Sequence, residues 1–151
     1  MIFKSVFLVF LCILSSCNGS RENSLRDKIG QMIMVGFRGK DVKELATIKK
    51  VIIEDKIGGV ILFNKDMALN TRPRNLESFQ QIKSLINGIQ KVANIPLFIA
   101  VDQEGGVVAR LNKDNGFSKM LSHKELASRK DLKFTAKHIF KVANEMNKAG
   151  F

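Results

Sequence analysis

Several residue types are rare or absent in this sequence, which has no tryptophan, no tyrosine and only two cysteines, two histidines and two prolines. Cys12 lies inside an apolar N-terminal segment that we expect to be removed, and Cys17 follows that segment directly, so no pair of thiols remains for a disulfide or a metal. Gly58-Gly59 precedes a strand pattern instead of opening a helix, which is the wrong context for a phosphate-binding loop. We therefore predict no metal site and no cofactor.

Acidic residues are outnumbered by basic ones, since 25 lysines and arginines against 14 acids give a formal net charge of +11. Such a balance can indicate nucleic-acid binding. The lysines, however, are spread along every helical pattern, and the tryptophan and tyrosine rings that stack on bases are missing. We therefore expect no nucleic-acid partner and interpret the charge as a solvated surface that favours anionic lipid or an acidic cell-wall polymer.

The N-terminal segment is typical of an export signal. An uncharged run from Ser5 to Leu14 is too short to span a bilayer but suits the apolar core of a signal peptide. Leu14-Ser15-Ser16-Cys17 resembles the signal of bacterial lipoproteins, in which cleavage precedes the cysteine and the cysteine carries the lipid. Residues 1–16 would then be removed, Cys17 would be lipidated, and residues 17–23 would form a polar tether. We expect an exported lipoprotein anchored to a membrane of the bacterial cell envelope; the alternative is an ordinary secretory signal with an incidental cysteine.

Residues 24–151 alternate between helical and strand patterns. The expected helices are 24–31, 41–54, 76–93 and 131–149, with a short helical turn near Lys124, and the expected strands are 32–36, 60–63 and 97–101. Strands that are apolar on both faces and alternate with helices require a parallel sheet with right-handed crossovers. The fold class is therefore α/β, and the patterns alone fit both an open sheet and a (β/α) barrel.

The run from Phe98 to Leu111 carries the strongest functional pattern. Its apolar residues 98–101 end at two carboxylates, Asp102 and Glu104, which a glycine pair follows. In this arrangement a parallel strand delivers an acid to a site at its carboxyl end. Gly105-Gly106 permits a sharp backbone turn without a side chain that would block a pocket. We therefore predict that Asp102 can bind a ligand.

Three segments carry a family resemblance: Ile29-Gly30-Gln31-Met32 with Val35-Gly36-Phe37, Gly58 to Phe63, and Asp102-Gln103-Glu104-Gly105-Gly106. In their order and spacing they resemble the N-terminal domain of the family 3 glycoside hydrolases, and within it the bacterial β-N-acetylhexosaminidases. The resemblance extends from about Leu25 to Phe151 and so includes nearly all of the expected mature chain.

This resemblance implies a (β/α)8 TIM barrel, of which residues 24–151 form the first three to four units and leave the barrel incomplete. It also implies hydrolysis of O-glycosyl bonds in a carbohydrate substrate, an N-acetylglucosamine-containing glycan, by an aspartate nucleophile and a histidine acid/base that are both expected beyond Phe151. Asp102 corresponds to the carboxylate that binds hydroxyls of the terminal sugar. An ionised carboxylate can accept hydrogen bonds from two neighbouring hydroxyls, which agrees with that role.

Glu104 and Arg110 are expected to support Asp102. Glu104 lies two residues beyond Asp102, and we predict that it pairs with an arginine such as Arg110. The alternative is that Asp102 and Glu104 are the two catalytic carboxylates of a glycosidase. Acids so close at one strand end, however, rarely face each other across a sugar at the separation of roughly 5 Å or more that the mechanism requires. His123 and His138 are interpreted as structural.

The sequence also departs from the family pattern. Val107 and Ala109 stand where a basic and a polar residue are expected, and the segment 118–121 lacks an expected proline. A complete barrel takes roughly 250 residues, so we expect either an interrupted gene product or the first part of a longer enzyme. The chain alone is expected to be inactive and to fold poorly or associate, because three strands leave unpaired edges.

The alternative to a glycosidase is a non-catalytic, membrane-anchored lipoprotein that serves as a binding or assembly module. The missing tryptophan and tyrosine rings count against a stand-alone sugar-binding module, because such sites usually stack rings on sugar faces. Release of a chromophore from an aryl N-acetylglucosaminide by the complete protein would separate the two functions.

Overall fold

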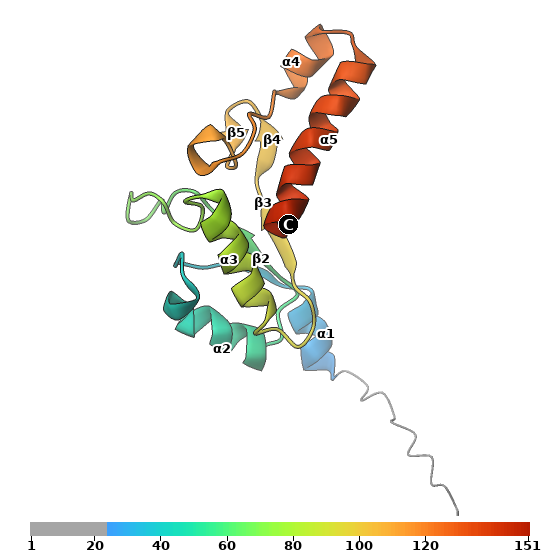
Figure 1. Cartoon of the computed structure of the whole chain (residues 1–151). Coiled ribbons are helices and arrows are strands. Elements are labelled where there is room, and N and C mark those ends of the chain that lie inside the picture. The colour runs from blue at the N-terminus through green and yellow to red at the C-terminus, as the bar shows by residue number, and fades with distance from the viewer. Residues whose placement is uncertain (1–23) are drawn as a thin grey trace, which may run out of the picture.

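The computed structural model describes residues 24–151, so the expected signal peptide (1–16), the lipidation site Cys17 and the tether (17–23) lie outside the described residues. In chain order the elements are α1 (Leu25–Gln31), β1 (Met34–Gly36), the 3-10 helix η1 (Val42–Glu44), α2 (Ala46–Glu54), β2 (Gly59–Leu62), α3 (Phe79–Gln90), β3 (Phe98–Val101), β4 (Gln103–Gly105), β5 (Val108–Ala109), the 3-10 helix η2 (Lys113–Asn115), α4 (His123–Ser128) and α5 (Leu132–Ala149). Figure 1 shows the sheet with α2 and α3 beside it, and a second group formed by β4, β5, α4 and α5.

Three strands form a parallel sheet in the order β1-β2-β3, in which Met34, Gly59 and Phe98 lie opposite one another. The three strands predicted from the sequence are confirmed to within two residues at their ends, as is the α/β class. Strands β4 and β5 form a separate antiparallel hairpin, which the sequence patterns do not predict. Because β1, β2 and β3 are parallel, their carboxyl ends share one edge of the sheet.

The core lies between the sheet and the helices α2 and α3. Val60 and Leu62 of β2 are completely buried and belong to one apolar cluster with residues of both helices. The helical members of this cluster are Ile48, Ile52, Ile82, Leu85, Ile86 and Ile89. Complete burial of an isoleucine or leucine side chain stabilises the fold by about 1.5 to 3 kcal/mol, so this cluster is the main source of cohesion between sheet and helices.

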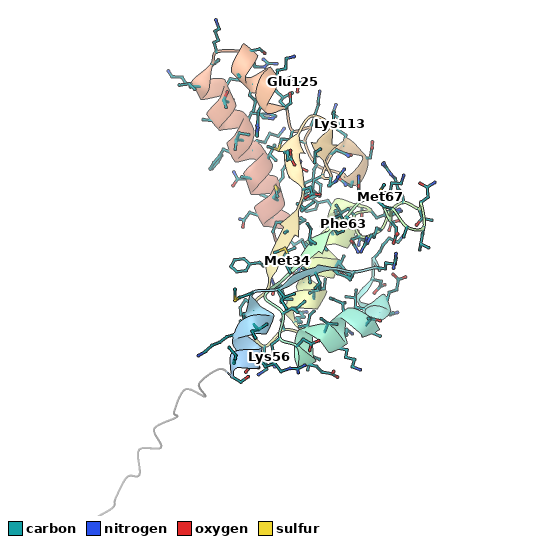
Figure 2. The ribbon with its side chains drawn as sticks, turned by 180° about the vertical axis from the view of Figure 1, so that it is seen from behind. Met34, Lys56, Phe63, Met67, Lys113 and Glu125 are labelled. Carbon is teal, nitrogen blue, oxygen red and sulfur yellow. The ribbon has the colours of Figure 1, made fainter. Side chains whose placement is uncertain are left out.

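The opposite face of the sheet is open in the part of the chain that the structure describes. Phe98 of β3 is 76% exposed and Met34 of β1 is 45% exposed. Figure 2 shows Met34 on this open face. Within residues 24–151 only one face of the sheet is therefore covered, because α2 and α3 both pack against the face opposite Met34 and Phe98.

The predicted helix 41–54 is divided into η1 and α2. The Asp41 carboxylate accepts a hydrogen bond from the Lys43 amide (3.0 Å), and the Asp41 carbonyl accepts one from the Glu44 amide (3.0 Å). These bonds close a separate short turn, and Leu45 then breaks the helical path with φ −90° and ψ 17°. The apolar spacing continues through this break, so it cannot reveal where the α-helix begins.

Two other predicted helices are present, and their predicted boundaries agree with the structure to different degrees. The segment 76–93 contains α3, which begins later than predicted because the Ser78 hydroxyl accepts a hydrogen bond from the Gln81 amide (3.3 Å) and caps the helix. The segment 131–149 is confirmed as α5, with Asp131 as its N-terminal cap. Among residues 24–151, no helix combines the length and the apolar character that crossing a membrane requires.

Close backbone contacts fasten α1 to the strand β2. The amide of Gly58 donates a hydrogen bond to the Gly30 carbonyl (3.0 Å), and a Cβ at Gly58 would lie only 1.9 Å from the Gln31 carbonyl oxygen. An ion pair between Lys56 Nζ and Asp27 Oδ2 (2.7 Å) closes the same junction. The hydrogen bond from Lys56 lowers the pKa of Asp27 below its ordinary value.

We predict that Gly58→Ala destabilises the chain by about 1 to 3 kcal/mol, because the added methyl group forces α1 away from β2. Thermal and urea unfolding followed by circular dichroism would measure this loss. The matched control is Gly88→Ala in the interior of α3, where alanine is expected to stabilise the helix by up to about 1 kcal/mol. An unchanged unfolding midpoint for Gly58→Ala would contradict the close packing described above.

Candidate functional site

Asp102 lies at the carboxyl end of β3. Because side chains alternate along a strand, the side chain of Asp102 is expected on the same side as Phe98 and Ala100, which is the open face of the sheet. The Asp102 side chain is 40% exposed, so a ligand can reach its carboxylate. This position is the one that the sequence predicts for a binding acid, and the binding role itself stays a prediction.

Arg110 lies beside Asp102 and not beside Glu104. Arg110 Nη2 is 3.7 Å from Asp102 Oδ2, whereas the exposed Glu104 carboxylate has no hydrogen bond or ion pair within residues 24–151. The predicted pair of Glu104 with Arg110 is therefore wrong. The register of the hairpin explains the difference, because Gln103 lies opposite Ala109 and Arg110 therefore comes next to Asp102.

Side-chain amides fix the hairpin that carries Arg110. Gln103 Nε2 donates to the Leu111 carbonyl (2.9 Å), and the Leu111 amide donates to Gln103 Oε1 (3.0 Å). The Arg110 amide donates to the Asp102 carbonyl (3.2 Å), and Nδ2 of the buried Asn115 donates to the Arg110 carbonyl (2.8 Å). The backbone of Arg110 is therefore held on both sides, which keeps its guanidinium group near the Asp102 carboxylate.

The glycine pair allows the hairpin to turn against the loop 118–122. Gly105 and Gly106 have φ values of 90° and 64°, a conformation that other residues rarely adopt. A Cβ at Gly105 would lie 2.2 Å from the Leu121 carbonyl oxygen, and the Gly106 amide donates to the Met120 carbonyl (3.1 Å). The predicted sharp turn is confirmed, and both the backbone conformation and the contact with this loop require glycine.

Glu145 of α5 holds the beginning of the same loop. Its carboxylate accepts hydrogen bonds from the amide and the hydroxyl of Ser118, both at 2.7 Å. Burial alone would raise the pKa of Glu145, but the hydrogen bonds from Ser118 and the charges of Lys141 and Lys148 lower it below its ordinary value. The loop that supports the hairpin is thereby tied to a long helix.

The two histidines take different positions. His138 Nε2 accepts a hydrogen bond from the Leu121 amide (3.1 Å), and its ring stacks on Phe134 with 5.9 Å between the ring centres. These contacts agree with the interpretation of His138 as structural. His123 is the exposed first residue of α4, and its structural role stays a prediction. Within residues 24–151, no group of three or more His, Cys, Asp or Glu could hold a metal ion.

Two polar residues near the end of β2 were not selected from the sequence. Asn75 is completely buried: its Nδ2 donates to the carbonyls of Phe37 (3.3 Å) and Gly39 (2.9 Å), and its Oδ1 accepts from the Phe63 amide (3.0 Å). Arg74 Nε also donates to the Phe37 carbonyl (2.8 Å), and its guanidinium lies 4.9 Å from the centre of the Phe63 ring. These residues join the segment after β1 to the end of β2, at the same edge of the sheet as Asp102.

Asp66 organises the loop that follows β2 and was likewise not among the site residues predicted from the sequence. Arg38 donates to both carboxylate oxygens of Asp66, whose side chain is 4% exposed, and the amides of Ala68 and Leu69 donate to Oδ1 (3.0 and 3.1 Å). The hydrogen bond from Arg38, followed by that from Leu69, lowers the pKa of Asp66 to about 2. Aspartate side chains in turns typically accept hydrogen bonds from main-chain amides two or three residues further on. The bonds of Asp66 to Ala68 and Leu69 could therefore have been suggested from the sequence.

We predict that Asp66→Asn removes an acid-sensitive part of the stability. Asp66 in the folded chain has a pKa of about 2, below its ordinary value of 3.8. The stabilisation is therefore complete when the pH lies well above 3.8 and is lost as the pH falls towards 2. Thermal unfolding of both proteins by circular dichroism should show that the advantage of the wild type shrinks over this range. A difference in midpoint that stays constant as the pH falls would contradict the assigned ionisation.

Comparison with known proteins shows which family the described residues match. Residues 24–151 match the glycosyl hydrolase family 3 N-terminal domain. The beta-hexosaminidase A of Pseudoalteromonas piscicida is 34% identical over 109 residues, which cover 60% of this chain and 17% of that protein. The beta-hexosaminidase of Tolumonas auensis is 39% identical over 72 residues, which cover 48% of this chain and 18% of that protein. The matched segments therefore span less than a fifth of these two relatives.

Solved structures show the same fold. A glycoside hydrolase family 3 beta-N-acetylglucosaminidase from Paenibacillus sp. str. FPU-7 superposes with a TM-score of 0.72 and 32% identity, over 85% of this chain and 23% of that one. NagZ from Neisseria gonorrhoeae, in complex with N-trifluoroacetyl-D-glucosamine, superposes with a TM-score of 0.59 and 25% identity, over 79% of this chain and 33% of that one. Since the family domain matches all the described residues, the chain belongs to glycosyl hydrolase family 3.

Proposed function

We propose that this chain supplies substrate binding to a family 3 glycosidase that hydrolyses O-glycosyl bonds in N-acetylglucosamine-containing glycans. The observation that carries the proposal is the accessible carboxylate of Asp102 at the carboxyl end of β3, with Arg110 beside it at 3.7 Å. The names of the relatives, beta-hexosaminidases, support the reaction class. The glucosamine derivative bound in the structure of NagZ from Neisseria gonorrhoeae supports the sugar.

In this proposal Asp102 accepts hydrogen bonds from hydroxyls of the terminal sugar. Bonds to an ionised carboxylate are roughly twice as strong as bonds between neutral groups, and a carboxylate can serve two neighbouring hydroxyls at once. A site built in this way discriminates against analogues that lack the hydroxyls, because a bound analogue would cover the carboxylate without donating hydrogen bonds to it. Asp102 thereby contributes to specificity as well as to affinity.

We also propose that the parallel sheet is the first part of a (β/α) barrel. The open face with Met34 and Phe98 would then line the barrel interior, and Asp102 would lie at the carboxyl end, where such barrels hold their substrates. The nucleophile and the acid/base would come from polypeptide outside residues 24–151. The matched segments cover only 17% of the beta-hexosaminidase A of Pseudoalteromonas piscicida and 23% of the Paenibacillus enzyme, which leaves most of each relative to carry other residues of the active site.

The catalytic proposal predicts that Asp102→Ala lowers kcat/KM for an aryl N-acetyl-β-glucosaminide by roughly 30-fold to 1000-fold, or about 2 to 4 kcal/mol. The loss is expected because the sugar hydroxyls would face no carboxylate in the transition state. The measurement is release of the aryl chromophore by the longest polypeptide in which this chain occurs. The matched control is Glu104→Gln, which removes a neighbouring carboxylate that has no hydrogen bond or ion pair within residues 24–151, and which is expected to change kcat/KM less than about threefold.

Two results would contradict the proposal: equal losses from Asp102→Ala and Glu104→Gln, or no activity in a folded complete protein. Sugar binding without turnover in that protein would favour the non-catalytic binding module instead. Circular dichroism of each variant distinguishes a lost contact from a lost fold.

We further propose that the chain is an exported lipoprotein, anchored to a membrane of a bacterial cell envelope through Cys17. The apolar run from Ser5 to Leu14 and the small residues Ser15 and Ser16 before Cys17 support this localisation. Several acyl chains on one cysteine give durable attachment, because the affinity grows with every buried methylene group.

The localisation proposal predicts that Cys17→Ser abolishes labelling by an alkyne-tagged fatty acid in cells and moves the protein from the membrane fraction to the soluble fraction. Cys12→Ser is the matched control and is expected to keep the label, because Cys12 would leave with the signal peptide. Labelling that persists in Cys17→Ser would exclude this attachment site.

A further inference from the structure

One side of α5 is strongly basic and exposed. Lys133, Lys137, Lys141 and Lys148 are all exposed and project from the same side of the helix, since they are spaced by four and seven residues. Figure 1 shows α5 at the edge of the molecule, with α3 and β3 on its inner side. The inner side is apolar, because Val142 and Ala149 are buried.

The acids of this region are too few to balance the lysines of α5, although the charges of Lys141 and Lys148 act on the Glu145 carboxylate. Residues 118–151 contain seven lysines and one arginine but only three acids, Glu125, Asp131 and Glu145. Glu125 caps α4 through Ser122 and pairs with Lys119 (3.6 Å), and Asp131 caps α5. Glu145 is bonded to Ser118, and among the described residues no carboxylate lies within 4.0 Å of an α5 lysine nitrogen.

An apolar side chain stands among these charges. Phe140 is 69% exposed on the outer side of α5. Phe140 lines a groove on this side together with Lys137, Lys141 and Lys148. Lysines around an exposed phenylalanine are typical of a helix that lies in the interface of a membrane, where the ring enters the acyl boundary and the amines remain at the headgroups. A soluble anionic polymer offers no apolar phase for the ring.

We infer that the outer side of α5 docks on an anionic lipid surface, with Phe140 inserted and with Lys133, Lys137, Lys141 and Lys148 at the phosphate groups. The charge complementarity of this surface to phospholipid headgroups carries the inference, and the exposed ring selects a membrane over other polyanions. Each lysine near such a surface contributes about a fivefold increase in membrane affinity, which salt reduces. The inference does not depend on the lipidation of Cys17.

The test uses the absence of native tryptophan. In the full chain, Phe140→Trp places a single indole on α5, so all the indole fluorescence reports this one position. We expect a blue shift of the emission, and quenching by brominated acyl chains, when vesicles of phosphatidylcholine with phosphatidylglycerol are added. Vesicles of phosphatidylcholine alone are expected to cause neither change.

The positional control is Met67→Trp. Met67 is 77% exposed in the loop after β2, and Figures 1 and 2 both show this loop and α5 on opposite sides of the molecule. Its emission is expected to remain unchanged with either vesicle, even if the N-terminal segment binds lipid. Equal blue shifts at positions 67 and 140 would overturn the inference.

The charge control compares two pairs of substitutions in the Phe140→Trp background. Lys137→Gln with Lys141→Gln is expected to raise the lipid concentration for half-maximal shift by roughly 30-fold, about fivefold for each lysine. Lys43→Gln with Lys113→Gln removes the same charge from exposed positions on other elements and is expected to raise it less than about threefold. Circular dichroism confirms that each variant keeps the wild-type fold.

Four further results would overturn the inference. The emission at position 140 could remain unchanged when vesicles that contain phosphatidylglycerol are added, or it could shift equally with vesicles of phosphatidylcholine alone. Soluble polyphosphate could cause the same blue shift, which would assign the surface to an anionic polymer. A shift that grows with protein concentration in the absence of vesicles would assign it to a second copy of this chain.

Discussion

Parallel pairing of β2 with both of its neighbours is the constraint on which the rest of the structure depends. It brings the carboxyl ends of three strands to one edge, although the segments that leave them, at Phe37, Phe63 and Asp102, are far apart in the sequence. The buried Asn75 then joins the first two of these segments by bonding to the main chain on both sides. The polar groups of the site are neighbours because of this register, since no local sequence pattern brings them together.

The sequence predicts the elements that depend on burial alone. Unbroken apolar runs locate all three parallel strands, and apolar spacing locates the faces of α2, α3 and α5. The helix ends could not be predicted with the same precision, because they depend on single hydrogen bonds such as those of Asp41 and Ser78. The position of Asp102 was predictable because a carboxylate ends an apolar strand.

The partners of the polar residues were not predictable from local patterns. Glu104 is close to Arg110 in the sequence, yet the register of the hairpin places Arg110 beside Asp102 instead. Asp66 has local bonds to Ala68 and Leu69 that turn statistics suggest, but its ion partner Arg38 comes from the segment after another strand. A buried polar side chain needs hydrogen-bond partners, and these partners come from segments that are distant in the sequence. Such sites can therefore be identified only when the fold is known.

A series of polar contacts connects α5 to the carboxylate of Asp102. Glu145 holds Ser118, the loop beyond it bonds to Gly106, and the hairpin places Arg110 at Asp102. The position of α5 relative to the carboxyl end of β3 is therefore set by this series of hydrogen bonds and one ion pair. A substitution that breaks the contact between Glu145 and Ser118 would therefore loosen the support of the hairpin that carries Arg110, at a distance along the chain from Asp102 itself.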